Sequence, residues 1–147
     1  MGGLITSPVV WTRTLHVLAA LWAAAGIFAT AVVLAILKRT ADSGGRQLGL
    51  RVAWRLTAVY TVPGVIVAGL LGFYQVTAAR MGFRAGWVQA SSVLYLVLLA
   101  IVLLAQAPAL RKAAQGGGPL SPAVAMLTHV GALLVVLLVL LMAFKPF

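Results

Sequence analysis

Residues Thr14–Leu37 read TLHVLAALWAAAGIFATAVVLAIL and contain no charged side chain. At a rise of about 1.5 Å per residue, a helix of this length crosses the roughly 30 Å hydrocarbon core of a bilayer. The stretch also contains His16, and ionisable residues are rare inside membranes. The helical face that starts at this histidine continues with small or apolar residues: Ala20, Ala23, Gly26 and Ile27. The stretch therefore predicts a membrane-spanning helix that carries a histidine on a packing surface.

The composition of the 147 residues is that of an integral membrane protein. It is 63% hydrophobic and 8% charged, with a mean hydropathy of +1.12, and no soluble domain of this size could bury so much apolar surface. Eleven Lys and Arg face one acid, and their position at the ends of apolar runs favours anionic lipid head groups over nucleic acid. The absence of cysteine excludes disulfides, iron–sulfur clusters and thiolate ligands. The scarcity of carboxylates removes the usual acid–base pairs, which favours a non-enzymatic protein.

Four apolar runs predict spans at about 12–37, 52–75, 87–107 and 122–144. We expect residues 1–147 to form one all-α domain, an antiparallel four-helix transmembrane bundle. Pro63 should kink the second helix by removing a backbone donor, which is tolerated where a neighbouring helix satisfies the freed carbonyl. Gly64, Ala68 and Gly72 lie four residues apart and form a small-residue stripe, suited to close packing inside the bundle or against a partner protein.

The cations are unequally divided between the two ends of this predicted bundle. The segments that follow the first and third spans hold seven: Lys38, Arg39, Arg46, Arg51, Arg55, Arg111 and Lys112. The opposite end has four: Arg13, Arg80, Arg84 and Lys145. The positive-inside rule then predicts that the seven lie in the cytoplasm and that both termini lie outside a bacterial cytoplasmic (inner) membrane.

Two segments, TLHVLAALWAAAGIFAT at 14–30 and TH…LLMAFKP within 128–146, resemble a bacterial family of small four-helix integral membrane proteins of unknown function. That family is related to copper-resistance-D-type membrane proteins and, more distantly, to the membrane protoporphyrinogen oxidase of haem synthesis. In the oxidase branch a first-helix histidine followed by Trp and Gly is tied to haem b binding, and the matching positions here are His16, Trp22 and Gly26. The branch also uses a lysine within a later helix, whereas every Lys and Arg here falls at a helix end or in a loop. The resemblance implies a connection with haem or copper and no particular reaction.

Two histidines on two helices, His16 and His129, suggest axial ligands for haem b, with small neighbours (Ala20 and Ala23; Ala125 and Ala132) leaving room for a macrocycle. Counting residues places His16 roughly 5–10 Å below the outer surface and His129 roughly 10–13 Å above the inner one. In a core of about 30 Å the vertical offset is about 7–15 Å. Because both ligands of one iron lie at nearly equal depth, we expect separate sites.

Each histidine shares its predicted level with polar residues of other helices. The group around His16 comprises Tyr74, Gln75, Gln89 and Ser92, and the group around His129 comprises Thr30, Thr57, Tyr60 and Thr61. Either group could be a proton path, a quinone head-group pocket or a site for five-coordinate haem. Hydrogen bonding between helices explains each group equally well.

Two further functions compete with a haem or other redox cofactor. Met126 and His129 are three residues apart on one helical face, and thioether plus imidazole suits Cu(I). Alternatively, the chain is a cofactor-free accessory or structural subunit of a larger membrane complex. Its loops are short, so contacts with partner proteins or with further copies would be lateral and within the lipid.

Overall fold

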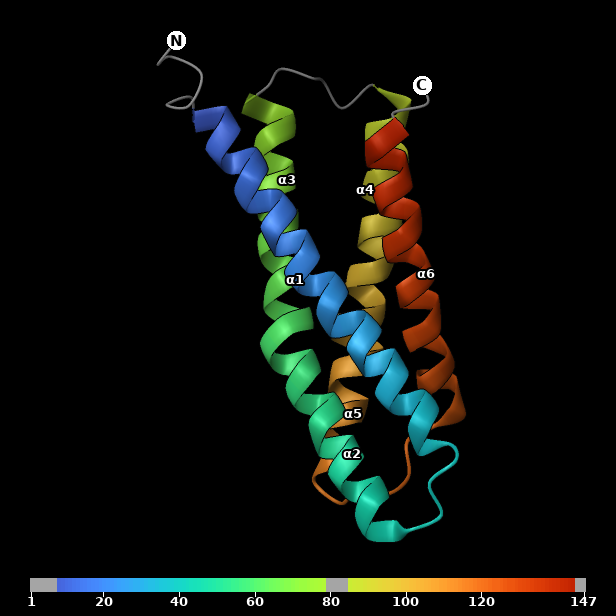
Figure 1. The fold of residues 1–147 in the computed structure, drawn as a ribbon. Coiled ribbons are helices and arrows are strands. Elements are labelled where there is room, and N and C mark those ends of the chain that lie inside the picture. The colour runs from blue at the N-terminus through green and yellow to red at the C-terminus, as the bar shows by residue number, and fades with distance from the viewer. Residues whose placement is uncertain (1–7, 79–84, 145–147) are drawn as a thin grey trace.

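The computed structural model describes residues 8–78 and 85–144, and the regular structure in these ranges is entirely helical. The first span is α1 (Pro8–Leu37), and the fourth is α6 (Pro122–Phe144). The second span is built from α2 (Ser43–Leu56), the π-helix η1 (Thr57–Thr61) and α3 (Val62–Ala78). The third is built from α4 (Gly86–Ala100), the π-helix η2 (Ile101–Gln106) and α5 (Ala107–Ala114). Each span is long and apolar enough to cross a membrane, and neighbouring spans run in opposite directions, which confirms the predicted four-helix fold (Figure 1).

The second span is longer than the sequence indicated, because its helix begins at Ser43 and not near residue 52. Asp42 caps this end, and its carboxylate accepts a hydrogen bond from the backbone N–H of Gly45. Such a cap satisfies one of the free donors of the first turn and starts the helix within a segment whose glycines suggested a break. Arg46 therefore lies on a helix and not in a loop.

The third span is also longer than predicted, since it continues through Pro108 to Ala114 and does not end near residue 107. Proline normally ends or kinks a helix, because it lacks an N–H and its ring clashes with the carbonyl four residues earlier. Here Pro108 lies two residues after the end of η2. Local π adjustments are one of the means by which membrane helices accommodate proline.

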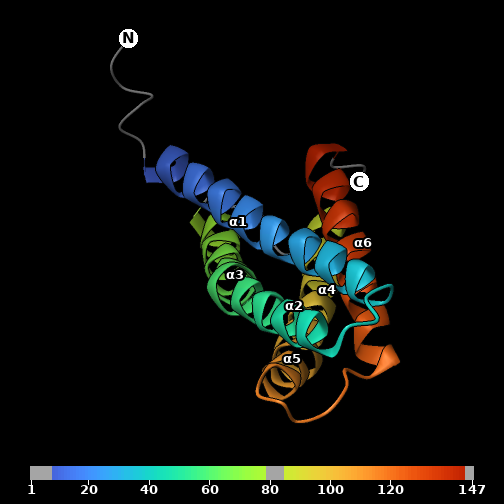
Figure 2. The ribbon, with the colours of Figure 1, turned by 60° about the horizontal axis from the view of Figure 1, so that its bottom comes forward.

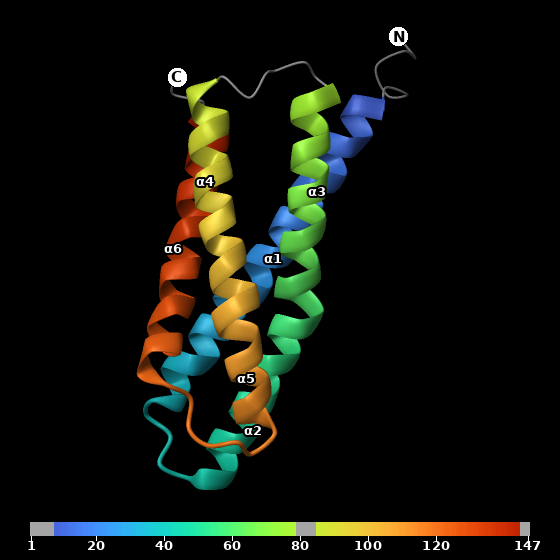
Figure 3. The same ribbon diagram turned by 180° about the vertical axis from the view of Figure 1, so that it is seen from behind.

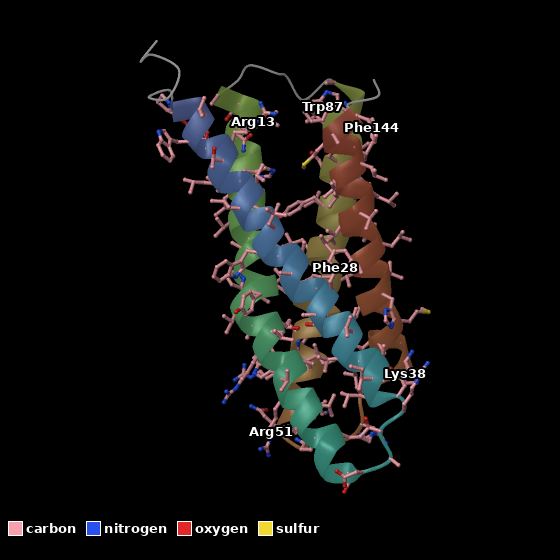
Figure 4. All side chains as sticks on the ribbon, in the orientation of Figure 1. Arg13, Phe28, Lys38, Arg51, Trp87 and Phe144 are labelled. Carbon is pink, nitrogen blue, oxygen red and sulfur yellow. The ribbon has the colours of Figure 1, made fainter. Side chains whose placement is uncertain are left out.

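The helices pair unequally along the bundle. α1 packs along α3 and η1 at its start and reaches α6 toward its end, so it lies obliquely across the other spans (Figure 2). Where α1 begins, the pair α1–α3 is separated from the pair α4–α6, and the pairs converge toward the opposite end (Figures 1 and 3). Trp87 and Phe144 mark the first of these ends, and Lys38 and Arg51 lie near the second (Figure 4).

The interior consists of two separate apolar clusters. The larger one holds buried residues of all four spans: Ala23, Ile27, Val65, Leu98, Val102, Leu134 and Leu138. The smaller one, nearer the end where α2 begins, holds Leu34, Ala53 and Leu110. Many large apolar side chains on all four spans are exposed, as expected for helices in lipid.

Candidate functional site

His16 is held against α3 by a hydrogen bond and by close contact with a glycine. Its Nδ1 lies 2.8 Å from the backbone oxygen of Ala68, which can only accept, so Nδ1 carries the proton of this hydrogen bond. A Cβ added to Gly72 would lie 3.0 Å from Cε1 of His16. A side chain at position 72 would crowd the imidazole ring, so the glycine on α3 leaves room for it.

The small-residue stripe of α3 faces α1 along its whole length. A Cβ on Gly64 would lie 2.6 Å from the backbone nitrogen of Ala23, so the two backbones are in direct contact there. Ala68 accepts the histidine bond and Gly72 contacts its ring. The stripe therefore packs against α1 within the bundle.

Trp22 and Gly26, which the resemblance linked to haem b, contact η1. The indole Nε1–H of Trp22 donates to the backbone oxygen of Val59 at 3.1 Å. In an α-helix that oxygen would accept from residue 63, which is proline and has no N–H. Trp22 also stacks on Tyr60, with ring centroids 5.1 Å apart. The expected satisfaction of the carbonyl freed by Pro63 is confirmed, and Trp22 on α1 provides the donor.

Gly26 lies at the closest approach of α1 to η1. A Cβ at Gly26 would lie 2.5 Å from Oγ1 of Thr61 and 2.7 Å from Cβ of Tyr60. Those separations leave no room for any side chain, so glycine is required at this crossing. The position serves helix packing.

The polar group expected around His16 does not assemble. Gln75 lies on the same α1–α3 contact, and its Nε2 donates to the backbone oxygen of Thr12 at 3.3 Å. Gln89 and Ser92, in contrast, are exposed on α4, and the Ser92 hydroxyl donates to Val88 of its own helix. Because the α1–α3 and α4–α6 pairs are apart at this end, residues at one height lie on different pairs.

His129 lies on the outer surface of α6. It is exposed together with Met126, whereas the neighbouring Thr128 is fully buried. His16 contacts the middle of α3, at Ala68 and Gly72, and His129 lies in the second turn of α6, toward the end of the bundle where that helix begins (Figure 1). The two rings are therefore at different heights, as the residue count indicated. Tyr60 is 38% exposed and does not join the interior threonines at the level of His129.

A layer of buried polar side chains separates the two apolar clusters, and we call it the polar layer. Every span contributes at least one residue with at most 1% exposure: Thr30, Thr57, Thr61, Gln106 and Thr128. On each of the first three spans, the buried polar residues lie between a residue of the larger cluster and a residue of the smaller one. On the fourth span, Thr128 lies between Leu134 of the larger cluster and Leu120, which packs against the smaller cluster. The hydroxyls of Thr30 and Thr57 lie 3.4 Å apart, while Thr61 Oγ1 and Gln106 Nε2 have no hydrogen-bond partner among the described residues.

The sequence predicted only part of the polar layer. The sequence places three of its threonines at one level, but the predicted third span ends near residue 107, which puts Gln106 at a helix end. The four-residue spacing Val102, Gln106, Leu110 is the signal that could have identified it, since all three lie on one buried face.

No family model, curated protein or solved structure matches the chain. The resemblance to small four-helix membrane proteins thus stays a prediction, and functional inference depends on the geometry of the chain itself.

That geometry limits where a haem or a metal could be held. The space beside His16 that was expected for a macrocycle is filled: Ala23 is 5% exposed and contacts Gly64, and Gly72 receives the imidazole. The one feature that matches a metal ligand is the hydrogen bond of His16 to Ala68, because a metal-bound histidine usually donates its other ring N–H to a carbonyl or carboxylate. Within the described residues, no group of three or more His, Cys, Asp or Glu could hold a metal ion. Met126 and His129 therefore gain no third ligand of these types for copper.

Proposed function

We propose that the protein is an accessory subunit of a larger membrane complex, and that its partner packs on the outer face of α6. The observation that carries this proposal is the exposure of His129. Its position is seven residues into α6, about 10 Å along the helix from Pro122. Ionisable residues within a membrane almost always face a protein interior or a water-filled cavity, because lipid cannot hydrogen-bond them. A partner helix that covers His129 provides such an interior.

The neighbours of His129 are suited to helix packing. Exposed residues recur on α6 at alternating steps of three and four: Met126, His129, Leu133, Val136 and Leu140. This 3.5-residue period keeps a seam facing a second helix that crosses at about 20°. Methionine at such a seam adapts to an irregular surface.

Charge favours a different protein over a second copy of this chain. The net charge is +10 with one acidic residue, so two copies would bring like charges together at their ends. A membrane protein with acidic loops would complement them. The proposed partner is therefore an integral membrane protein whose loops carry net negative charge.

Site-specific photocrosslinking in native membranes tests this proposal. A photoreactive residue at Leu133 should give one stoichiometric adduct with an acidic-loop membrane protein, and His129→Leu should abolish it. The matched control is the same residue at Leu70 on α3, which is 68% exposed and should react only with lipid. Equal adducts from both positions, or an adduct that persists in His129→Leu, would contradict the proposal.

A further inference from the structure

A pocket of about 430 Å³ opens at the end of the bundle where α1 ends and α2 begins. Its walls come from the end of α1, the start of α2 with the connection before it, the segment that joins α5 to α6, and the start of α6. Leucines line its inner part (Leu34, Leu37, Leu50 and Leu120), and Lys38 and Arg46 line it as well. The volume is within the range of small-molecule sites in proteins.

The two cations in this pocket have almost no acid to pair with. Asp42 is the single acidic residue of the chain, and its carboxylate accepts from the N–H of Gly45 at the start of α2. It does not line the pocket, although Ala41 and Ser43 on either side of it do. Lys38 and Arg46 thus present positive charge to whatever occupies the pocket.

The pocket wall is anchored where the joining segment leaves α5. Gln47 Nε2 donates to the backbone oxygen of Ala114 at 2.8 Å, which ties α2 to the end of α5. The chain then turns through Gly116 and Gly118, whose φ angles of 84° and 102° favour glycine. Both glycines line the pocket, and a Cβ on either would meet no atom within 4 Å. The opening is therefore a feature of the backbone path.

We propose that this pocket binds the phosphate group of an anionic phospholipid. Lys38 follows directly on the last residue of α1, so the cations lie at the depth where a span leaves the hydrocarbon and lipid phosphates begin. Lys38 and Arg46 bind the phosphate, and the leucine wall contacts the adjoining glycerol and the start of the acyl chains. Basic pockets between membrane helices bind lipid head groups in this way. This site shares no residue with the outer face of α6 and does not depend on the accessory-subunit proposal.

The test compares two double variants that remove the same charge. Lys38→Gln with Arg46→Gln empties the pocket of cations, while Arg51→Gln with Arg55→Gln removes two exposed arginines of α2 that do not line it. Arg51 and Lys38 lie on opposite sides of this end of the bundle (Figure 4). All four side chains are exposed, so neither variant should disturb folding.

Native mass spectrometry in mild detergent measures binding of phosphatidylglycerol, with phosphatidylcholine as the zwitterionic reference. Each cation that contacts the bound phosphate should contribute about fivefold in affinity, so the pocket variant should bind phosphatidylglycerol about 25-fold more weakly. The control variant should change affinity by less than about twofold. Equal losses in the two variants, or equal binding of the two lipids by the wild-type protein, would overturn the proposal.

A competition with inorganic phosphate distinguishes the source of the phosphate group. If the leucine wall contributes, millimolar phosphate should leave phosphatidylglycerol bound. If inorganic phosphate displaces phosphatidylglycerol from the wild-type protein but has no effect on the pocket variant, these cations recognise a free anion. That result would overturn the lipid assignment.

Discussion

Replacing Trp22 by phenylalanine tests how the bundle accommodates Pro63. Phenylalanine preserves the aromatic contact with Tyr60 and removes only the indole N–H that donates to Val59. Val59 is 54% exposed on a surface that faces lipid, where no water replaces the lost donor.

The expected cost follows from two contributions. Hydrogen bonds between membrane helices average about 0.6 kcal/mol and reach about 1.7 kcal/mol. Leaving a carbonyl without a partner adds a desolvation cost of about 1–3 kcal/mol when the environment cannot compensate. We therefore expect Trp22→Phe to lower the free energy of unfolding by about 2–4 kcal/mol.

A double-mutant cycle with Pro63→Ala makes the prediction specific. Alanine restores an N–H at residue 63, so this turn can return to α geometry, in which residue 63 donates to the carbonyl of Val59. In that background Trp22→Phe should cost less than about 0.5 kcal/mol, within the usual range of surface substitutions. Reversible unfolding in mixed micelles with increasing SDS provides the measurement. The control is Trp11→Phe, an exposed tryptophan near the start of α1, which should have a small effect in both backgrounds. If Trp22→Phe costs the same with and without Pro63, the indole does not compensate for the proline.

Three further substitutions test the packing of the interior by the same unfolding measurement. Gly64→Ala should destabilise the protein by about 2 kcal/mol or more, because the added Cβ would meet the Ala23 backbone. The control Gly131→Ala should be tolerated, because its Cβ would lie 3.6 Å from the nearest atom, and similar costs for both would contradict the close α1–α3 contact. His16→Leu should lower the free energy of unfolding by about 1 kcal/mol, and His16→Asn should lower it less because an amide N–H takes the place of Nδ1–H. An equal loss in both variants would show that the hydrogen bond to Ala68 contributes little. Gln106→Met should stabilise by about 1 kcal/mol because it removes a buried amide nitrogen that has no partner, so a clear destabilisation would indicate that the amide is satisfied.

The four spans could be predicted from the sequence because length and hydropathy decide whether a helix crosses a bilayer. The side of each helix that faces inward could not, except where small residues mark it. Lipid tails are as apolar as leucine, so the hydrophobic effect does not orient a span about its axis. Gly64, Ala68 and Gly72 indicated the α1-facing side of α3 through their size. α6 has no comparable stripe, and the outward direction of His129 is visible only in the structure.

The two π-helices and the polar layer form one structural feature. Each π-helix ends two residues before a proline, η1 before Pro63 and η2 before Pro108. Each also contributes to the polar layer, through Thr57 and Thr61 in η1 and through Gln106 in η2. A π turn adds a residue to the helical turn and lets a membrane helix continue past the missing N–H. The buried polar groups therefore lie where the backbone of two spans departs from regular α geometry. The apolar clusters on either side hold the four helices together, so local rearrangement of the bundle should begin in this layer.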